Sequence, residues 1–252
     1  MRGQIDMHPS TRHLPDADPG DPRQPPRRNG LTAEFRKRTR SLHVQAERSG
    51  IIRELLHGRA SRFGYALYLR NLLPAYREME RGLARQRDAP GVGIITQPAL
   101  CRATAIESDL VILCGQHWHA LLPLLGAGER YASRVKAAGE GDGARLLAHA
   151  YVRYLGDLSG GQILGRSLSR SLGLGFRTLS FHEFPDIADL EGFKLAYRDA
   201  IDRAAAAMID VEAVIEEAAV AFQLNMDVSE AVHAVPERVE GATRIRDGSP
   251  VS

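Results

Sequence analysis

Apolar residues recur at intervals of three and four along the chain from about residue 31 to residue 235, which is the spacing of one helical face. Alternating patterns rich in β-branched residues are scarce, and glycine or proline interrupts the helical pattern at regular intervals. The sequence therefore predicts an all-α, single-domain multi-helix bundle. Helices are expected over residues 32–49, 60–88, 100–124, 128–138, 142–172, 189–208 and 211–232. Thr32 is the expected N-cap of the first helix, and Gly173 with Gly175 is expected to end the fifth.

The two ends of the chain lack this periodicity. Residues 1–30 hold six of the thirteen prolines, five arginines and four aspartates, so they bury too little apolar surface to offset the entropy of ordering them. We expect a disordered leader there, without the apolar segment of a signal peptide. The tail over residues 236–252 is expected to be flexible. Residues 31–235 then form one helical domain of ordinary size.

Composition and charge exclude several classes of function. The formal net charge is only +2, so we expect no nucleic-acid partner and no electrostatic binding to membranes. No stretch approaches eighteen consecutive apolar residues, so no membrane-spanning helix is predicted. Cys101 and Cys114 form no CxxC motif and are expected to be buried thiols of a cytoplasmic protein.

His43 is a candidate ligand because it follows Leu42 on the apolar stripe of the first predicted helix, together with Ala46. The simpler interpretation is a core histidine whose ring is hydrogen-bonded by a neighbour. The alternative is a metal ligand. Arg36 lies one heptad earlier, roughly 10 Å away along the axis, and Glu47 lies one turn later. A flat ligand with a metal centre and a remote carboxylate fits that separation.

The segment YVRYLGDLSGGQILG, which begins at Tyr151, places four glycines inside a helical pattern. Each costs about 1 kcal/mol relative to alanine. Gly156 and Gly160 share one helical face, and Gly161 and Gly165 share another. Either small residues allow close helix packing here, or the backbone approaches the plane of a ligand, with a kink at the glycine pair.

Charged residues one helical turn apart offer further candidates. Asp157 follows Arg153 by one turn in the glycine-rich segment. Either the two residues form an exposed ion pair, or the Asp157 carboxylate orders a water in a pocket. Lys194 and Arg198 have the same spacing. Two such cations are usually solvent-exposed, but if they converge with Arg36 they form a clamp for carboxylates.

Four motifs, in this order, closely resemble the biliverdin-producing heme oxygenases. They are LHVQAE around His43, YVRYLGDLSGGQIL from Tyr151, FPDIADLEGFKLAYR from Phe184 and VIEEAAVAFQLN from Val214. The resemblance extends from about Leu31 to Val232 without a large gap, and its second motif is highly specific. It implies a helical bundle that holds haem between a proximal helix and a kinked distal helix.

The resemblance also implies roles for individual residues on the proximal side. His43 is expected to be the proximal ligand of the haem iron, with Glu47 as its neighbour. The haem propionates are expected to be bound by Arg36, Tyr151, Lys194 and Arg198. Arg36 departs from the family, in which lysine is common, but keeps the positive charge.

On the distal side, the resemblance places Gly156 and Gly160 over the haem face, and Phe222 lines the pocket. Asp157 is expected to complete a distal network, assisted through water by Arg153, Tyr76 and Asn225. In this arrangement the glycine backbone acts by shape, and the carboxylate acts by holding water.

The activity implied by the resemblance is cleavage of haem by O2 and a reductant to biliverdin, carbon monoxide and Fe(II). Haem b is then both substrate and cofactor, and the electron donor is a protein such as a ferredoxin or a flavin reductase. We expect a monomer. The alternative is a non-catalytic haem carrier or sensor of the same fold, which has no need of Asp157 or of the small Gly156 and Gly160.

Overall fold

Helices and the turns between them account for the residues that the structure, a computed structural model, describes, namely residues 30–174 and 179–236, and no strand occurs within these ranges. The α-helices are α1 (Leu31–Glu47), α2 (Gly50–Leu56), α3 (Arg62–Arg85), α4 (Ala103–Cys114), α5 (Trp118–Leu121), α6 (Gly126–Ala138), α7 (Leu146–Ala150), α8 (Gly156–Ser171), α9 (Leu190–Ala204) and α10 (Val211–His233). A π-helical segment (Tyr151–Leu155) joins α7 to α8, and short 3-10 turns cover Val92–Ile95, Pro98–Leu100 and Ala205–Ala207. The predicted all-α fold is confirmed.

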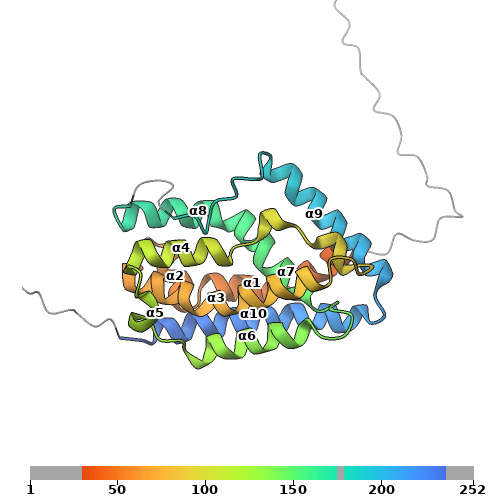
Figure 1. Cartoon of the computed structure of the whole chain (residues 1–252), viewed down its shortest axis with the longest axis horizontal. Coiled ribbons are helices and arrows are strands. Elements are labelled where there is room, and N and C mark those ends of the chain that lie inside the picture. Colours follow the sequence, from red (N-terminus) through yellow and green to blue (C-terminus); the bar gives the residue numbers. More distant parts are fainter. Residues whose placement is uncertain (1–29, 175–178, 237–252) are drawn as a thin grey trace, which may run out of the picture.

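The long helix α3 lies at the centre of the bundle. It packs against α4 and α6, and α1 packs against α10. Figure 1 shows α8 and α9 along one side of the molecule and α6 and α10 along the opposite side. Leu67, Leu69 and Leu72 of α3 are completely buried. Burial of a leucine side chain contributes roughly 1.5–3 kcal/mol, so α3 anchors the core against which the other helices pack.

Several predicted boundaries need correction. The helix expected over 100–124 is two helices, because Gly115 adopts a φ of +79° that ends α4. The helix expected over 142–172 begins at Leu146 and contains the π-helical segment. Helix α2 was not predicted, since seven residues are too few to show a clear period. Gly173, with a φ of +62°, follows α8 as predicted, whereas Gly175 lies outside the described residues.

The start of α1 is held in an unexpected way. Gly30 is the N-cap and offers no side-chain hydrogen bond, so the prediction of Thr32 as N-cap was wrong. The Thr32 backbone amide and hydroxyl instead donate to the carboxylate of Asp202 on α9, at 2.7 and 2.9 Å. The acceptor needed by the first turn therefore comes from another helix. These two hydrogen bonds connect the N-terminal end of α1 to α9.

The remaining expectations concern the chain ends, the membrane and the thiols. All but the last residue of the predicted leader (1–30) and all but the first residue of the predicted tail (236–252) lie outside the described residues. None of the helices in the described part is long and apolar enough to cross a membrane. Cys101 is exposed and Cys114 is partly exposed, so the prediction of buried thiols was wrong.

Candidate active site

His43 lies at the edge of the buried stripe of α1. The buried residues of that helix are Leu31, Phe35, Thr39 and Ala46. The His43 side chain is 62% exposed, and its Nδ1 lies 3.4 Å from a carboxylate oxygen of Glu47. The expectation that His43 faces the interior was wrong, because periodicity does not separate the centre of a stripe from its edge. This exposure also excludes the interpretation as a core histidine.

A small apolar cluster adjoins His43 and is separate from the main core. It consists of Ala46 from α1, Val152 from the π-helical segment, and Ala221, Phe222 and Met226 from α10, with Leu42 and Tyr151 packed against it. The ring of Phe222 lies 5.9 Å from that of His43, centroid to centroid. The cluster therefore brings the exposed imidazole and the residues that precede the glycine-rich helix to one place.

The four glycines of α8 divide between two environments. A Cβ atom added to Gly156 or Gly160 would meet nothing within 4 Å. A Cβ atom on Gly161 or Gly165 would lie 3.3 or 3.2 Å from His182. Close packing therefore explains one pair, whereas the other pair borders open space. The close-packing interpretation therefore holds for Gly161 and Gly165. The approach of a ligand to Gly156 and Gly160 stays a prediction.

The irregular backbone lies just before these glycines. Tyr151–Leu155 is π-helical, and the ribbon changes direction between α7 and α8 (Figure 1). The kink was expected at the adjacent Gly160 and Gly161, so the irregular segment ends five residues before the expected position. Single π-helical turns often occur at functional sites because they redirect the side chains that follow.

Asp157 and Arg153 form a buried network with residues of two other helices. The Asp157 carboxylate accepts hydrogen bonds from Arg153 Nη2 at 3.0 Å and from the Tyr76 hydroxyl at 2.5 Å. Arg153 also donates to the Tyr76 hydroxyl at 2.8 Å and to Asn225 Oδ1 at 2.7 Å. Only 8% of the Asp157 side chain is exposed. An exposed ion pair is therefore excluded, and the contacts among these four residues are direct.

Burial dominates the electrostatics of this network. It raises the pKa of Asp157, and the charge of Arg153 with the hydrogen bond from Tyr76 opposes that rise. Burial likewise raises the pKa of Tyr76 well above its usual value. Tyr76 therefore keeps its proton at neutral pH and donates a hydrogen bond to the Asp157 carboxylate.

The cations predicted to bind carboxylates differ in their surroundings: Arg36 and Arg198 act on Tyr151, whereas Lys194 pairs with Glu191. Burial raises the pKa of Tyr151, and the positive charges of Arg198 and Arg36 oppose this rise. These two arginines lie on α9 and α1. Lys194 is mostly buried and donates to Glu191 at 2.5 Å. The expectation of a solvent-exposed pair was therefore wrong for Lys194.

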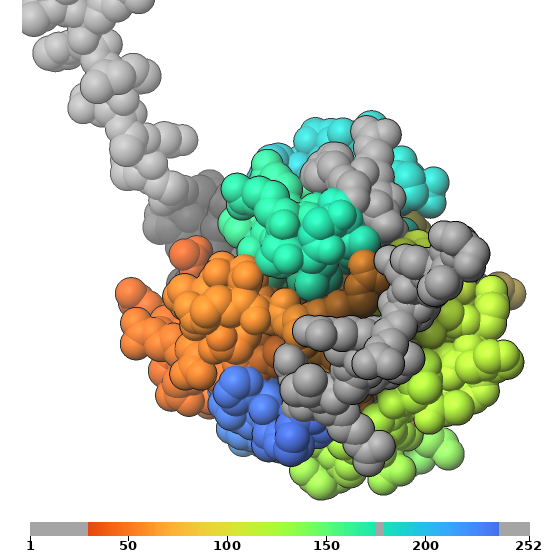
Figure 2. Space-filling view, turned by 90° about the vertical axis from the view of Figure 1, so that its left-hand side faces the viewer, coloured from red at the N-terminus to blue at the C-terminus, as the bar shows by residue number. Residues whose placement is uncertain are grey.

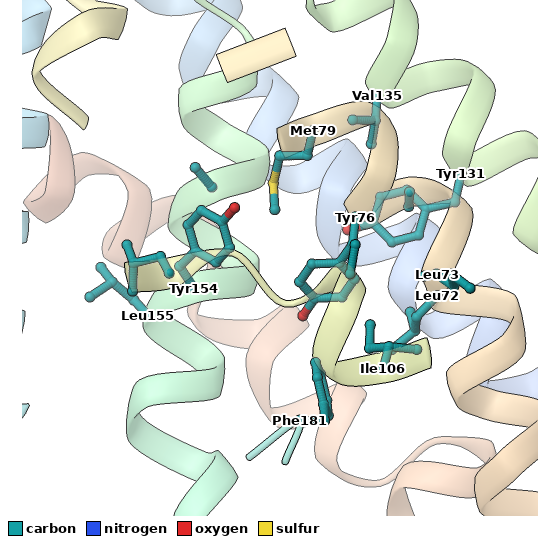
Figure 3. Close-up of a cluster of buried hydrophobic side chains, with 14 of the residues drawn as sticks. Leu72, Leu73, Tyr76, Met79, Ile106, Tyr131, Val135, Tyr154, Leu155 and Phe181 are labelled. Carbon is teal, nitrogen blue, oxygen red and sulfur yellow. The ribbon is translucent and has the colours of Figure 1, made fainter. Parts of the chain in front are cut away.

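Two tyrosines of the site were missed by the sequence analysis. The Tyr68 hydroxyl donates to Asn225 Oδ1 at 3.4 Å, and Tyr68 precedes Tyr76 by eight residues on α3, a spacing that indicates a shared face. The Tyr131 hydroxyl on α6 is buried and has no hydrogen-bond partner among the described residues. Figure 3 shows Tyr131 and Tyr76 in one buried apolar region, with Phe181 beside Tyr76. No local pattern around Tyr131 indicates this position.

Comparisons with known proteins agree with this architecture. The family model described as heme oxygenase matches residues 29–231. The heme oxygenase of Takifugu rubripes is 37% identical over 202 residues, covering 79% of this chain and 73% of that protein. Heme oxygenase 1 of Homo sapiens is 31% identical over 257 residues, covering 95% of this chain and 86% of that protein.

Among solved structures, heme oxygenase-1 from the cyanobacterium Synechocystis sp. in complex with heme superposes with a TM-score of 0.75 and 33% identity. The match covers 81% of this chain and 92% of that chain. An all-α bundle with an exposed imidazole, an adjoining apolar cluster and a glycine-lined helix has the features of a haem-binding oxygenase. The chain belongs to the heme oxygenase family.

Proposed function

We propose that this protein cleaves haem with O2 and reducing equivalents to biliverdin, carbon monoxide and Fe(II), with haem as substrate and cofactor. The observation that carries this proposal is the buried network of Asp157, Arg153, Tyr76 and Asn225 directly beside Gly156. A non-catalytic haem carrier needs an apolar wall and an iron ligand, but it does not need a buried carboxylate there.

The residues present fit haem. Gly156 and Gly160 leave an open face that Cβ atoms would fill, and the adjoining cluster around Phe222 supplies an apolar wall. Among the described residues, no group of three or more histidine, cysteine or acidic side chains is arranged to hold a metal ion. His43 therefore suits a metal that arrives in its own macrocycle and needs one axial ligand from the protein.

On the proximal side, Glu47 orients the ligand. Its carboxylate faces His43 Nδ1 at 3.4 Å, which favours a proton on that nitrogen and leaves Nε2 free to bind iron. A carboxylate partner of this kind fixes the tautomer and raises the basicity of a ligating imidazole.

At the edge of the site, cations orient the substrate. Arg36 and Arg198, with the hydroxyl of Tyr151, present donors for carboxylates, and a guanidinium binds a carboxylate through two parallel hydrogen bonds. Lys194 joins this group when it exchanges Glu191 for a propionate. The cations thereby fix the rotation of the ring and decide which meso carbon is oxidised.

On the distal side, the chain contributes shape and protons. Haem supplies the iron that binds and reduces O2 and the porphyrin carbon that is oxidised. The backbone at Gly156 and Gly160 limits the space above the ring, and the Asp157 carboxylate holds a water through the acceptor positions that Arg153 and Tyr76 leave free. A water held in this way delivers protons without placing a strong acid above the ring.

We further propose that the electron donor is an acidic protein, such as a ferredoxin or a flavin reductase, that docks beside α1. Lys37 and Arg40 are exposed on this helix, whereas Arg38 pairs with Glu212 at 2.7 Å. The turnover rate with such a donor should fall as the salt concentration rises, because screening slows a steered encounter. Equal rates at low and high salt would refute this docking site.

One chain supplies every proposed site residue, so we expect a monomer.

The proposed function is tested with hemin, a reductant such as ascorbate or a reductase system, and air. The absorption band of the haem complex should be replaced by that of biliverdin. His43→Ala should lose the axial bond and most of the activity, and added imidazole should restore part of both. His119→Ala, which removes an exposed histidine of α5, is the matched control. An unchanged ferric spectrum and full turnover in His43→Ala would show that another residue is the ligand.

A further inference from the structure

His182 lies against the face of α8 that is opposite the open glycines. Only 6% of the surface of His182 is exposed. A Cβ atom on Gly161 would lie 3.3 Å from His182 Nδ1, and one on Gly165 would lie 3.2 Å from His182 Cβ. The histidine therefore fills the space that these two glycines leave.

Further contacts hold His182 in place. Its Nε2 lies 3.2 Å from the Tyr65 hydroxyl, and the two rings are stacked at an interplanar angle of 19°. Its carbonyl oxygen accepts a hydrogen bond from the Gln162 side chain of α8 at 3.0 Å. His182 thus joins α8 to α3 through its side chain and its backbone.

The segment around His182 is also anchored to α4. The Asp109 carboxylate accepts hydrogen bonds from the backbone amides of Ser180 and Phe181, at 2.6 and 2.9 Å. The ring of Phe181 meets that of Tyr76 edge to face, with centroids 5.7 Å apart. The support behind α8 is therefore connected to the distal network by direct packing.

His182 acts here as a neutral ring. Burial, together with the charge of Arg153, lowers its pKa to about 3. Its Nδ1 is buried and has no hydrogen-bond partner among the described residues. As a neutral ring, this side chain fills volume and forms one hydrogen bond with the Tyr65 hydroxyl.

We propose that His182 is a positioning residue that sets the distance between haem and the face of α8 formed by Gly156 and Gly160. This rests on the proposed function, in which haem lies against that face. The two glycine pairs lie on different faces of one helix, so a displacement toward His182 increases the space above haem. A displacement away from His182 decreases that space. Because cores are close-packed and transmit small shifts, the volume at residue 182 acts on the distal face without touching haem.

The first test measures the space above the iron with ligands of different size. Ferrous haem complexes are titrated with carbon monoxide and with n-butyl isocyanide, and the ratio of the two affinities is compared between variants. In His182→Ala the bulky isocyanide should gain at least about fivefold relative to carbon monoxide, which corresponds to roughly 1 kcal/mol. His182→Gln keeps most of the volume and a partner for Tyr65, so it should behave like the wild type.

A general loss of stability is separated by a matched control. Val135→Ala truncates a side chain that is 1% exposed on α6, and it should destabilise the protein without changing the ligand ratio. Hydrogen exchange in the haem-free protein should be faster in α8 for His182→Ala and not for Val135→Ala. Equal α8 exchange in the two variants would overturn the proposal.

The second test displaces α8 in the opposite direction. Gly161→Ala places a methyl group against the His182 ring and should lower the affinity for the isocyanide. His182→Ala should rescue this variant, because it removes the ring that the methyl group meets. Gly160→Ala adds the same methyl group to the open face, and His182→Ala should not rescue it. A wild-type protein that binds no hemin would refute the proposed function, whereas hemin binding with an unchanged ligand ratio in His182→Ala overturns only the positioning role.

Discussion

Replacement of Asp157 by alanine separates an oxygenase from a haem carrier. The side chain touches neither the proposed iron ligand nor the proposed propionate cations, so Asp157→Ala should bind hemin with near-wild-type affinity. Its biliverdin yield should nevertheless fall strongly, because no carboxylate then holds the distal water. Reaction with H2O2 should shift toward peroxidase-like oxidation of added phenols. Asp157→Asn should retain part of the yield, since an amide oxygen still accepts from Tyr76.

The structure also sets the magnitude of the change in stability. Breaking a buried ion pair costs about 3–5 kcal/mol, because the remaining charge loses its partner. Arg153 keeps Tyr76 and Asn225 as acceptors, so we expect the lower end, about 3 kcal/mol, for Asp157→Ala. Glu212→Ala is the matched control. It breaks the exposed pair with Arg38, and exposed pairs contribute less than about 1 kcal/mol.

Urea unfolding of the haem-free variants measures these free energies, and hemin titration followed by single-turnover assays measures binding and product. A loss in Asp157→Ala as small as that in Glu212→Ala would contradict the buried network. A wild-type biliverdin yield at unchanged haem occupancy would refute the role of Asp157 in catalysis, and the carrier interpretation would gain support.

Two further predictions concern charged groups. Replacing Lys194 and Arg198 by glutamate should change the ratio of biliverdin isomers, measured by chromatography, because the ring loses its rotational anchor; unchanged isomers at retained activity would show that these cations do not hold the propionates. Although burial raises the pKa of Glu217, hydrogen bonds from His149 and Arg134 outweigh it and lower that pKa from 4.5 to about 2. The ionised carboxylate therefore stabilises the fold above pH 4.5, and this contribution is lost as the pH falls toward 2. Glu217→Gln should be less stable by about 3 kcal/mol at pH 7, and denaturant unfolding should show the difference from the wild type narrowing below pH 4.5; a pH-independent difference would contradict the ionised state.

Periodicity predicted the helices well because each long helix buries one face against α3 or its neighbours. It failed where a single backbone angle decides the structure, as at Gly115, and where a helix is as short as α2. It also placed His43 in the interior, since the sequence does not show which neighbour covers each face. These errors share one cause: local patterns do not contain the tertiary contacts.

The same limit applies to the site. The spacing of Arg153 and Asp157 predicts an ion pair, and the structure contains it. Its burial depends on Tyr76 from α3 and Asn225 from α10, which lie 81 residues before Asp157 and 72 residues after Arg153. Only the resemblance to a family linked these four positions. Tyr131, which no motif included, became visible only when the helices were packed.

The glycines of α8 show how the two sides of one helix serve different purposes. Gly161 and Gly165 are favoured by the packing itself, because a Cβ atom there would lie 3.3 or 3.2 Å from His182. Packing within the described residues does not require Gly156 and Gly160, because a Cβ atom there would meet nothing within 4 Å. Alanine at these two positions would be better by about 1 kcal/mol each on helix propensity alone. The chain forgoes that stability on the face that borders the apolar cluster and the distal carboxylate, which supports the proposal that haem binds against this face.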